Sequence, residues 1–349
     1  MNKMKQYGLT DRFSALASMY EGLTVGRVIS QEKNLYRIVT ENGERYAQVS
    51  GKFCYNAGTV SDYPAVGDFV MVELGTYDGN AVIHRILDRK SCFIRKAAGK
   101  SRQEQVVATN IDTLFLCMSL NNDYNLRRME RYLSIAWDSG ASPVIVLTKS
   151  DLCNDIQSKL AEMEKIAFGV DILVTTALED NGYAQLLPYI TEGKTVAFIG
   201  SSGVGKSTLI NRLLGEERIE TNGLRDDDRG RHTTTHRELL CIPSGGAVMD
   251  TPGMRELGMW DSEDGVDRTF ADIQELACRC QFKDCSHNGE KGCAVCAALE
   301  SGMLSEERWM SYKKLKSEIS YAADSDSYLA AKERKFKEIA KYNKTNRKR

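Results

Sequence analysis

Short stretches of β-branched and aromatic residues, separated by polar turns, run through residues 23–90. Turn signals lie at 41–43 and 78–80, where Asn and Gly favour tight hairpins. The predicted strands are Val25–Ile29, Leu35–Thr40, Arg45–Val49, Asp68–Leu74 and Ala81–Leu87. Five short strands in about 65 residues favour a small closed barrel such as an OB-fold. Another small β-barrel or a sandwich is the alternative, and residues 1–22 are expected to be a separate N-terminal segment.

From residue 111 onward, buried-type strands alternate with amphipathic helices. The predicted strands are Ile111–Leu120, Pro143–Leu147, Asp171–Val174, Thr195–Ile199, Arg237–Ile242 and Gly246–Asp250. The predicted helices are Leu126–Trp137, Asp155–Ala167 and Leu209–Leu214. Because this alternation builds parallel sheets with helices on both faces, residues 109–258 are expected to form a doubly wound, mostly parallel α/β domain. Residues 91–108 are expected to be the linker between it and the barrel.

The chain after Gly258 is expected to form a helical domain over residues 259–349. A long polar helix is predicted from about Ser305 to Lys341. The last stretch, 332–349, holds nine Lys or Arg residues against two Glu, which makes a basic tail. The expected architecture is therefore multidomain α/β, with a barrel, an α/β domain and a helical domain in that order.

Length and composition fit this picture. A chain of 349 residues exceeds what one hydrophobic core usually supports. The formal net charge is −1, so a nucleic-acid-binding surface would have to be local. The sequence has neither an apolar run of signal-peptide type nor a transmembrane stretch, and we therefore expect a cytoplasmic protein with no membrane partner. Ten cysteines are present, and clustered thiols in such a chain favour metal over disulfides.

A glycine-rich loop follows the predicted strand Thr195–Ile199 and precedes a predicted helix. Its residues fit the phosphate-loop pattern and are Gly200, Ser201, Ser202, Gly203, Val204, Gly205, Lys206, Ser207 and Thr208. The glycines allow backbone N–H groups to surround a β-phosphate, and the helix N-terminus favours negative charge. Lys206 is expected to neutralise β- and γ-phosphate oxygens, and Ser207 to bind Mg²⁺. A purely structural turn is the alternative.

A second candidate loop reads Thr148-Lys149-Ser150-Asp151. It ends a predicted strand, and ligands bind at the carboxyl edge of such sheets. The Asp151 carboxylate can accept hydrogen bonds from the ring N–H and the exocyclic amine of guanine, a pair that adenine does not offer. Lys149 is expected to lie along the base, whereas Thr148 replaces the more usual Asn. Thr176 and Ala177, after the next strand, are expected to supply a backbone N–H to guanine. An ordinary strand-to-helix turn is the alternative.

Two further segments resemble nucleotide switches. Asp250-Thr-Pro-Gly253 follows an apolar strand, so Asp250 is expected to hold Mg²⁺ through water and the Gly253 N–H to sense the γ-phosphate. Between this segment and the phosphate loop lies GRHTTT at 230–235, where Thr234, with Thr233 close behind, is expected to complete the Mg²⁺ shell. A solvated loop is the alternative.

A cluster of cysteine and histidine lies in the helical domain. Cys280, Cys285, His287 and Cys293 supply three thiolates and one imidazole. This set suits tetrahedral Zn²⁺ with no open position, which predicts a structural site. Cys278 and Cys296 are spare and are expected to be packed small residues. A redox switch is the alternative for the cluster.

The nucleotide motifs occur in an unusual order, TKSD, GSSGVGKST, DTPG. An ordinary GTPase has the phosphate loop first and the guanine-reading loop late, so the rotated order predicts a circularly permuted GTPase. With GRHTTT and the cysteine–histidine cluster, these motifs closely resemble the RsgA family of ribosome small-subunit-dependent GTPases. The resemblance implies an OB-fold in front, a circularly permuted P-loop GTPase domain and a C-terminal helical zinc-binding domain. It also implies that the small ribosomal subunit and its rRNA are partners, and that the subunit stimulates hydrolysis of GTP to GDP and phosphate during its late maturation.

One expectation concerns the attacking water. Many GTPases place Gln just after the glycine of the second switch, but this chain has Met254 there, which cannot orient water. Slow hydrolysis that awaits a partner is therefore expected. His232 is our candidate for the catalytic residue, and contact with RNA or solvent is its alternative role.

Two basic runs are candidates for rRNA contact. One is the tail 332–349, and the other comprises Arg89, Lys90, Arg95, Lys96, Lys100 and Arg102. A solvated charged surface is the alternative, and the resemblance favours phosphate contact. A monomer is expected. Two other functions stay open, namely a P-loop hydrolase or kinase that acts independently of ribosomes, and a zinc-dependent RNA-binding module with a vestigial GTPase.

Overall fold

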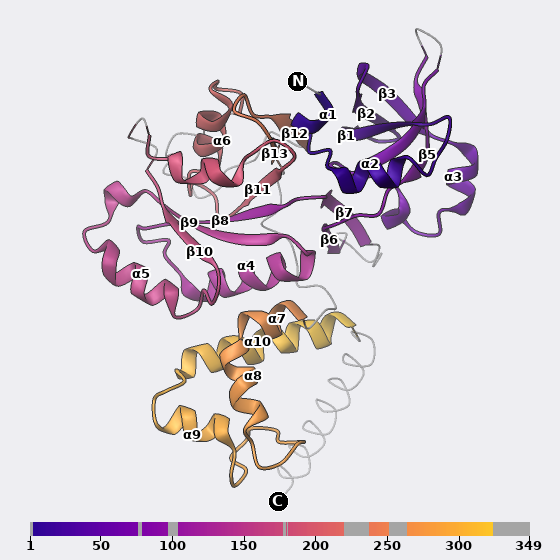
Figure 1. Ribbon diagram of the computed structural model, residues 1–349. Helices are drawn as coiled ribbons and strands as arrows, with labels where there is room; N and C mark the ends of the chain where they lie inside the picture. Colours follow the sequence, from indigo (N-terminus) through magenta and orange to yellow (C-terminus); the bar gives the residue numbers. More distant parts are fainter. Residues whose placement is uncertain are drawn as a thin grey trace, which may run out of the picture. The chain divides into compact units, whose positions relative to one another are not determined.

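The computed structural model describes residues 3–75, 79–96, 104–176, 179, 181–219, 237–250 and 264–323 (Figure 1). The chain divides into two compact units, Met1–Gly258 and Met259–Arg349. Within the described residues, the first unit contains a β-barrel and an α/β sheet, and the second unit is helical.

Five strands form a closed barrel near the start of the first unit. They are β1 (Thr24–Glu32), β2 (Leu35–Thr40), β3 (Gly43–Val49), β4 (Phe69–Glu73) and β5 (Ala81–Ile86). β1 pairs with β2 and β4, β2 with β3, and β4 with β5, all antiparallel, and a parallel pairing of β3 with β5 closes the ring. Helix α3 (Gly51–Asn56) and the 3-10 turn η1 (Val60–Asp62) lie between β3 and β4 in the chain. The predicted OB-like barrel is confirmed.

The residues before the barrel form two short helices, α1 (Lys3–Gln6) and α2 (Asp11–Ala17). Phe13 of α2 is fully buried, and its ring centroid lies 4.2 Å from that of Phe69 on β4. Met4 of α1 is buried in the same core. The N-terminal segment is therefore a packed part of the first unit.

The stretch that we expected to be a linker contains a second, two-stranded sheet. Its strands β6 (Cys92–Lys96) and β7 (Glu104–Thr109) pair antiparallel. Phe93 and Val107 are buried in the largest core of the unit. Their apolar side chains give this stretch a packing role besides that of a connection.

Six of the described strands form the α/β part of the first unit. They are β8 (Thr113–Ser119), β9 (Ser142–Thr148), β10 (Asp171–Val174), β11 (Thr195–Ile199), β12 (Glu238–Cys241) and β13 (Ala247–Asp250). Their spatial order is β10-β9-β8-β11-β13-β12, and only β12 is antiparallel to its neighbour β13. The strand that precedes the phosphate loop, β11, is fourth in the chain but lies inside the sheet between β8 and β13.

Helices cover both faces of this sheet (Figure 1). They are α4 (Leu126–Ser139), α5 (Ile156–Glu164) and α6 (Lys206–Leu214), with 3-10 turns η2 (Ser150–Leu152) and η3 (Ala184–Tyr189). Met129 of α4 and Met163 of α5 belong to one buried cluster, whereas Leu209 and Leu213 of α6 belong to another. Separate cores on the two faces confirm the doubly wound, mostly parallel arrangement.

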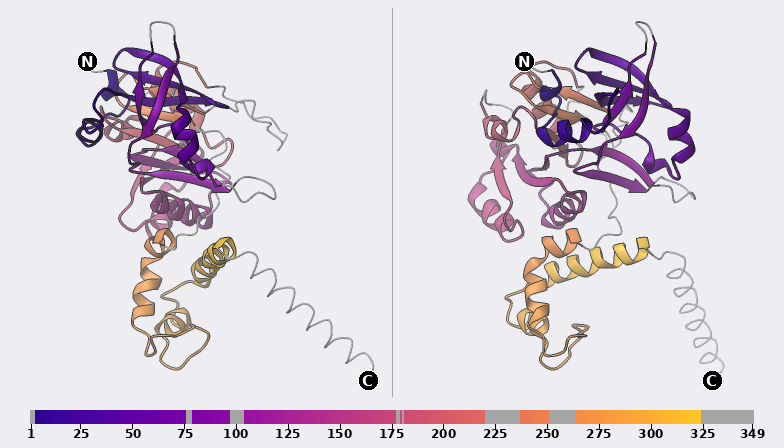
Figure 2. Two further views of the ribbon diagram at one scale, coloured as in Figure 1. Left: turned by 90° about the vertical axis from the view of Figure 1, so that its right-hand side faces the viewer. Right: turned by 45° about the vertical axis from the view of Figure 1, so that its right-hand side comes forward.

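Strand pairing makes the barrel and the α/β sheet continuous, and the right-hand view of Figure 2 shows the two parts next to each other. Strand β1 pairs antiparallel with β12 at Ser30 and Glu238, which gives one eleven-stranded sheet. An ion pair between Arg37 on β2 and Glu238 lies at the same junction. Two elements that are far apart in the sequence are thereby joined by backbone and side chains.

Arg27 on β1 is fully buried at this junction. Its guanidinium donates hydrogen bonds to the carbonyl oxygens of Tyr7, Gly67 (3.2 Å) and Asn110 (3.3 Å) and to Thr195 Oγ1 (2.8 Å). Burial lowers the pKa of Arg27 to about 10, although the carboxylates of Asp112 and Asp68 oppose this shift. A single side chain therefore connects the N-terminal segment, the barrel and the first residue of β11.

The second unit contains α7 (Asp264–Thr269), α8 (Ala271–Cys278), α9 (Ala294–Glu300) and α10 (Glu306–Ala323). Its core includes Phe270 and Trp309, and buried Arg308 forms a bidentate ion pair with Asp272, both bonds being 2.7 Å long. The predicted helix 305–341 is described as far as Ala323, and the basic tail lies outside the described residues. Among the described helices, none has the length and apolarity that a membrane crossing requires.

Candidate nucleotide and metal sites

The phosphate-loop candidate connects β11 to α6 at the carboxyl edge of the sheet. Gly205, the N-cap residue of α6, has a φ of +99°, a left-handed backbone that favours glycine. A Cβ at Gly200 would lie 2.5 Å from the carbonyl oxygen of Cys117 on β8, so the close approach of loop and strand requires glycine. Lys206 Nζ donates to the carbonyl oxygens of Gly200 at 2.8 Å and Ser201 at 2.7 Å. The ammonium group is thus held at the start of the loop.

The guanine-loop candidate is joined to the phosphate loop by a side-chain hydrogen bond. Thr148 is the last residue of β9, and its buried Oγ1 donates to the carbonyl oxygen of Val204 at 2.6 Å. Val204 is itself 1% exposed, which fixes this part of the loop against the sheet. A threonine hydroxyl therefore provides an anchor at the position where Asn is more usual. Lys149 follows with a φ of +57°, and this turns the chain away from the strand.

The remaining guanine-site candidates meet at the carboxyl ends of β9 and β10. Thr176 Oγ1 donates to Asp151 Oδ1 at 2.7 Å, and the Ser150 N–H donates to the carbonyl oxygen of Thr175 at 3.2 Å. Asp151 is exposed, so a base at this edge can reach its carboxylate. Ala177 lies outside the described residues.

A carboxylate that we did not predict also contacts the phosphate loop. Asp123 lies between β8 and α4, and its Oδ2 accepts a hydrogen bond from Ser201 Oγ. Its Oδ1 accepts one from Arg128 at 2.7 Å. Although burial raises the pKa of Asp123, the hydrogen bonds from Ser201 and Arg128 hold it below the ordinary value. The available signal was its position just after the strand 111–120, at the edge where the other loops end.

The switch segments are only partly described. His232, Thr233, Thr234, Gly253 and Met254 lie outside the described residues, and only the backbone of Asp250 is described. Asp250 is the last residue of β13, which pairs parallel with β11 through Ala197 and Met249. The end of β13 and the phosphate loop therefore share one edge, with Ser207 in the first turn of α6.

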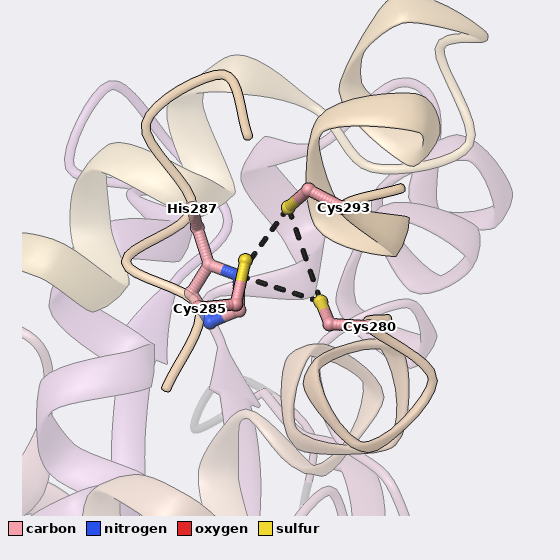
Figure 3. A group of neighbouring side chains, drawn as sticks. All are labelled: Cys280, Cys285, His287 and Cys293. Carbon is pink, nitrogen blue, oxygen red and sulfur yellow. Dashed lines mark hydrogen bonds between the residues drawn. The ribbon is translucent and has the colours of Figure 1, made fainter. Parts of the chain in front are cut away.

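Four side chains of the second unit converge in a metal-binding arrangement (Figure 3). The Sγ atoms of Cys280 and Cys293 are 3.9 Å apart, and His287 Nδ1 lies 3.6 Å and 3.4 Å from them. With Cys285, all four ligand atoms lie within 4.8 Å of one another. Tetrahedral Zn²⁺ with bonds of about 2.3 Å to sulfur requires sulfur–sulfur distances of about 3.8 Å. The cluster therefore fits a closed tetrahedral site.

The thiols of the cluster differ in acidity. Although burial raises it, hydrogen bonds from the Cys296 N–H and from His287 bring the pKa of Cys293 down to about 6. For Cys285, a hydrogen bond from the His287 backbone lowers the pKa, but burial and the neighbouring thiols outweigh it and raise the pKa to about 12. The arrangement thus favours one thiolate, and a metal ion would have to displace the remaining protons.

The spare cysteines have different surroundings. Cys296 is partly buried beside the cluster, and its N–H donates to Cys293 Sγ at 3.4 Å. Cys278 is exposed, so the expectation that it is packed was wrong. It lies five positions after buried Ile273 on α8, which places it on another side of the helix. None of the ten cysteines, all of which lie in the described residues, forms a disulfide.

Part of the basic run beside the barrel is engaged in ion pairs. Arg89 pairs with buried Asp68 at 2.7 Å, and Lys90 pairs with Asp112 at 2.6 Å. Both cations therefore connect parts of the first unit, and the contact of this run with RNA stays a prediction. The side chains of Arg95 and Lys96 and all of Lys100 and Arg102 lie outside the described residues.

Comparison with known proteins gives consistent matches. The protein-family model described as RsgA GTPase matches residues 86–260 of this chain. The small ribosomal subunit biogenesis GTPase RsgA 2 of Lactiplantibacillus plantarum is 49% identical over 317 residues, which cover 90% of this chain and 89% of that protein. The crystal structure of YjeQ from Thermotoga maritima has a TM-score of 0.64 and 28% identity, covering 85% of this chain and 98% of that one. The structure of YloQ, described as a circularly permuted GTPase, has a TM-score of 0.60 and 26% identity, covering 86% of this chain and 96% of that one.

Proposed function

This chain belongs to the RsgA GTPase family, and on that premise we propose that it hydrolyses GTP while bound to the small ribosomal subunit. The reaction converts GTP and water into GDP and phosphate during late maturation of the subunit, which stimulates turnover. The observation that supports this most strongly is the hydrogen bond from Thr148 to Val204. It joins the guanine loop to the phosphate loop at one edge of the sheet, as a single guanine nucleotide requires.

Each candidate residue has a role in this reaction. Asp151 accepts hydrogen bonds from the guanine ring N–H and amine, and Lys149 lies along the base. Lys206 leaves the carbonyl oxygens that now hold it and binds the β- and γ-phosphates, while backbone N–H groups of residues 200–208 surround them. Bound Mg²⁺ supplies positive charge at these phosphates, and Ser207, Thr234 and Asp250 are the residues that would hold it.

The attacking water requires a separate residue, because Met254 has no group that accepts its proton or orients it. We assign this role to His232, and we assign sensing of the γ-phosphate to the Gly253 N–H. The test compares subunit-stimulated GTP turnover of His232→Ala with that of the unmodified chain. A large loss of the stimulated rate with GTP affinity retained is expected, and near-normal stimulated turnover would remove His232 from the mechanism.

The decisive experiment is GTP turnover with and without purified small subunits. We expect slow turnover alone, faster turnover with small subunits and no stimulation by large subunits. Lys206→Ala should abolish both rates, whereas Glu164→Gln on α5, which is exposed, should change neither. Equal rates with and without small subunits would refute the proposed function and favour a nucleotide hydrolase that acts without ribosomes.

The second unit would hold one structural Zn²⁺ through Cys280, Cys285, His287 and Cys293. A closed set of four ligands leaves no position for substrate, so this ion stabilises the fold and does not take part in hydrolysis. We further propose that the basic tail 332–349 contacts rRNA phosphates, that the chain works as a monomer and that it acts in the cytoplasm. Affinity for small subunits should then fall as salt rises, and salt-independent binding would exclude phosphate contact.

A further inference from the structure

Asp123 lies where a carboxylate is electrostatically unfavourable for phosphate binding. Its Oδ2 accepts the hydroxyl of Ser201, the second residue of the phosphate loop. The negative charge of Asp123 would repel a polyphosphate bound in this loop. Arg128 opposes this effect through its 2.7 Å ion pair with Asp123, and the positive charge of Lys149 also favours the ionised carboxylate. Arg128 and Lys149 therefore compensate the negative charge of Asp123. The hydrogen bond from Ser201 is then the main effect of Asp123 on the phosphate loop.

The carboxylate is itself held in place from two sides. The Asp123 N–H donates to Asn121 Oδ1 at 3.0 Å, and Ser119 Oγ at the end of β8 donates to the same oxygen at 2.8 Å. Arg128 lies in the first turn of α4, where its N–H donates to the side chain of the N-cap residue Asn125 at 3.0 Å. An acceptor anchored to both a strand and a helix can fix the position of the side chain that donates to it.

Ser201, whose side chain Asp123 holds, also binds the phosphate-binding lysine, Lys206, through its carbonyl oxygen. Lys206 Nζ rests on the carbonyl oxygens of Gly200 and Ser201. The Ser201 side chain bonds to Asp123, and on the other side of the loop the Val204 carbonyl bonds to Thr148. The phosphate loop is thus attached at two points, and the second of them is the guanine loop.

We propose that Asp123 is a positioning residue of the nucleotide site, which holds the phosphate loop through Ser201 in the shape that receives a nucleoside di- or triphosphate. Arg128 neutralises the charge of Asp123 against the phosphates. This inference rests on the proposed function, because it assigns a role within the same guanine-nucleotide site. It places part of the affinity for phosphates in the loop between β8 and α4, outside the phosphate-loop motif.

The sign of a single substitution separates positioning from simple repulsion. Asp123→Asn removes a negative charge, so repulsion alone predicts tighter binding of GTP. Positioning predicts the opposite, because the amide has a single acceptor oxygen and cannot accept from both Ser201 and Arg128, as the carboxylate does. The expected loss is about tenfold in GTP and GDP affinity, as for a weakened hydrogen bond to a charged group. Ser201→Ala should give a similar loss, Ser201→Thr should retain the affinity, and the double variant should be no weaker than the weaker single variant.

The experiment measures the affinities of the full-length variants for GDP and GTP with a fluorescent guanine nucleotide. Guanosine, which has no phosphate, serves as a competitor, and its affinity should not change if Asp123 acts through the phosphate loop. Glu164→Gln, an exposed residue of α5, is the control for an equal loss of charge. Steady-state turnover of Asp123→Asn should have a raised KM with a nearly unchanged kcat.

Three results would overturn the inference. They are unchanged or tighter GTP binding by Asp123→Asn, additive losses in the double variant, and an equal loss of guanosine affinity, which would indicate general unfolding. If the unmodified chain bound no guanine nucleotide at all, the proposed function itself would fail. If the variants behave as expected but small subunits do not stimulate turnover, only the proposed function fails and the positioning role stands.

Discussion

Replacing Arg27 with methionine tests whether one buried side chain unites the barrel with the α/β sheet. Methionine fills a similar volume but donates no hydrogen bonds. The four acceptors of the guanidinium are the carbonyl oxygens of Tyr7, Gly67 and Asn110 and the hydroxyl oxygen of Thr195. The guanidinium carbon also lies 4.6 Å from the ring centroid of Phe69. The substitution therefore removes contacts to four separate segments at once.

The expected loss follows from these contacts. The Gly67 carbonyl keeps a hydrogen bond from Asn110 Nδ2 at 3.0 Å, so the cost falls mainly on the other three acceptors, which lose the guanidinium as donor. At about 1 kcal/mol for each bond the loss is about 3 kcal/mol, and easier burial of an uncharged side chain offsets part of it. We expect Arg27→Met to lower the free energy of unfolding of the first unit by about 2–3 kcal/mol.

The assay is urea unfolding of the full-length chain, with hydrogen exchange to locate the effect. Exchange should accelerate in β1, in β12 and at the start of β11. Arg85→Met on β5 is the matched control, because Arg85 is exposed, and it should change stability by less than about 0.5 kcal/mol. If Arg27→Met were as stable as this control, or more stable, the cost of burying the charge would exceed the value of its bonds, and our reasoning would be refuted.

Three further predictions concern the two candidate sites and the second core. Zinc binding to the metal-free chain should release protons and tighten with rising pH, because Cys285 has a raised pKa and must bind as thiolate. Calorimetry in buffers of different ionisation enthalpy measures the number of protons released, and a zinc affinity independent of pH would contradict the prediction. Thr148→Val should weaken GTP binding about five- to tenfold, whereas Thr148→Ser should keep the affinity, because only the hydroxyl reaches the Val204 carbonyl. Equal affinities of the two variants in a nucleotide titration would disprove this role of the hydroxyl. Arg308→Met should destabilise the second unit by about 3 kcal/mol, since the substitution leaves Asp272 without its bidentate partner. A thermal unfolding midpoint equal to that of the unmodified chain would count against this prediction.

Regular periodicity made much of the fold predictable from the sequence. The strands Asp171–Val174 and Thr195–Ile199 have the predicted bounds, because each is a short apolar run bordered by polar residues. The predicted strands before the two loop candidates are likewise present, since β9 ends at Thr148 and β11 ends at Ile199, next to Gly200. These features depend on neighbours in the chain, which is the information that a single sequence contains.

The features that were missed depend on residues distant in the sequence. Arg27 looks like an ordinary strand residue, and only the folded chain places four acceptors around it. The contact of Asp123 with Ser201 joins positions 78 residues apart, and no spacing rule predicts it. The ion pairs of Arg89 and Lys90 were not predicted either, because their acidic partners, Asp68 and Asp112, are separated from them by about 20 residues.

The pairing of β1 with β12 has a consequence for how this chain can be divided. A sheet edge with unpaired N–H and C=O groups invites pairing with other molecules, and β1 lies along the outer side of β12 at Ser30 and Glu238. A fragment that began at residue 109 would leave that side of β12 exposed to aggregation. The barrel therefore covers the edge strand of the α/β sheet. Fragments of the α/β domain intended for separate study should retain the barrel.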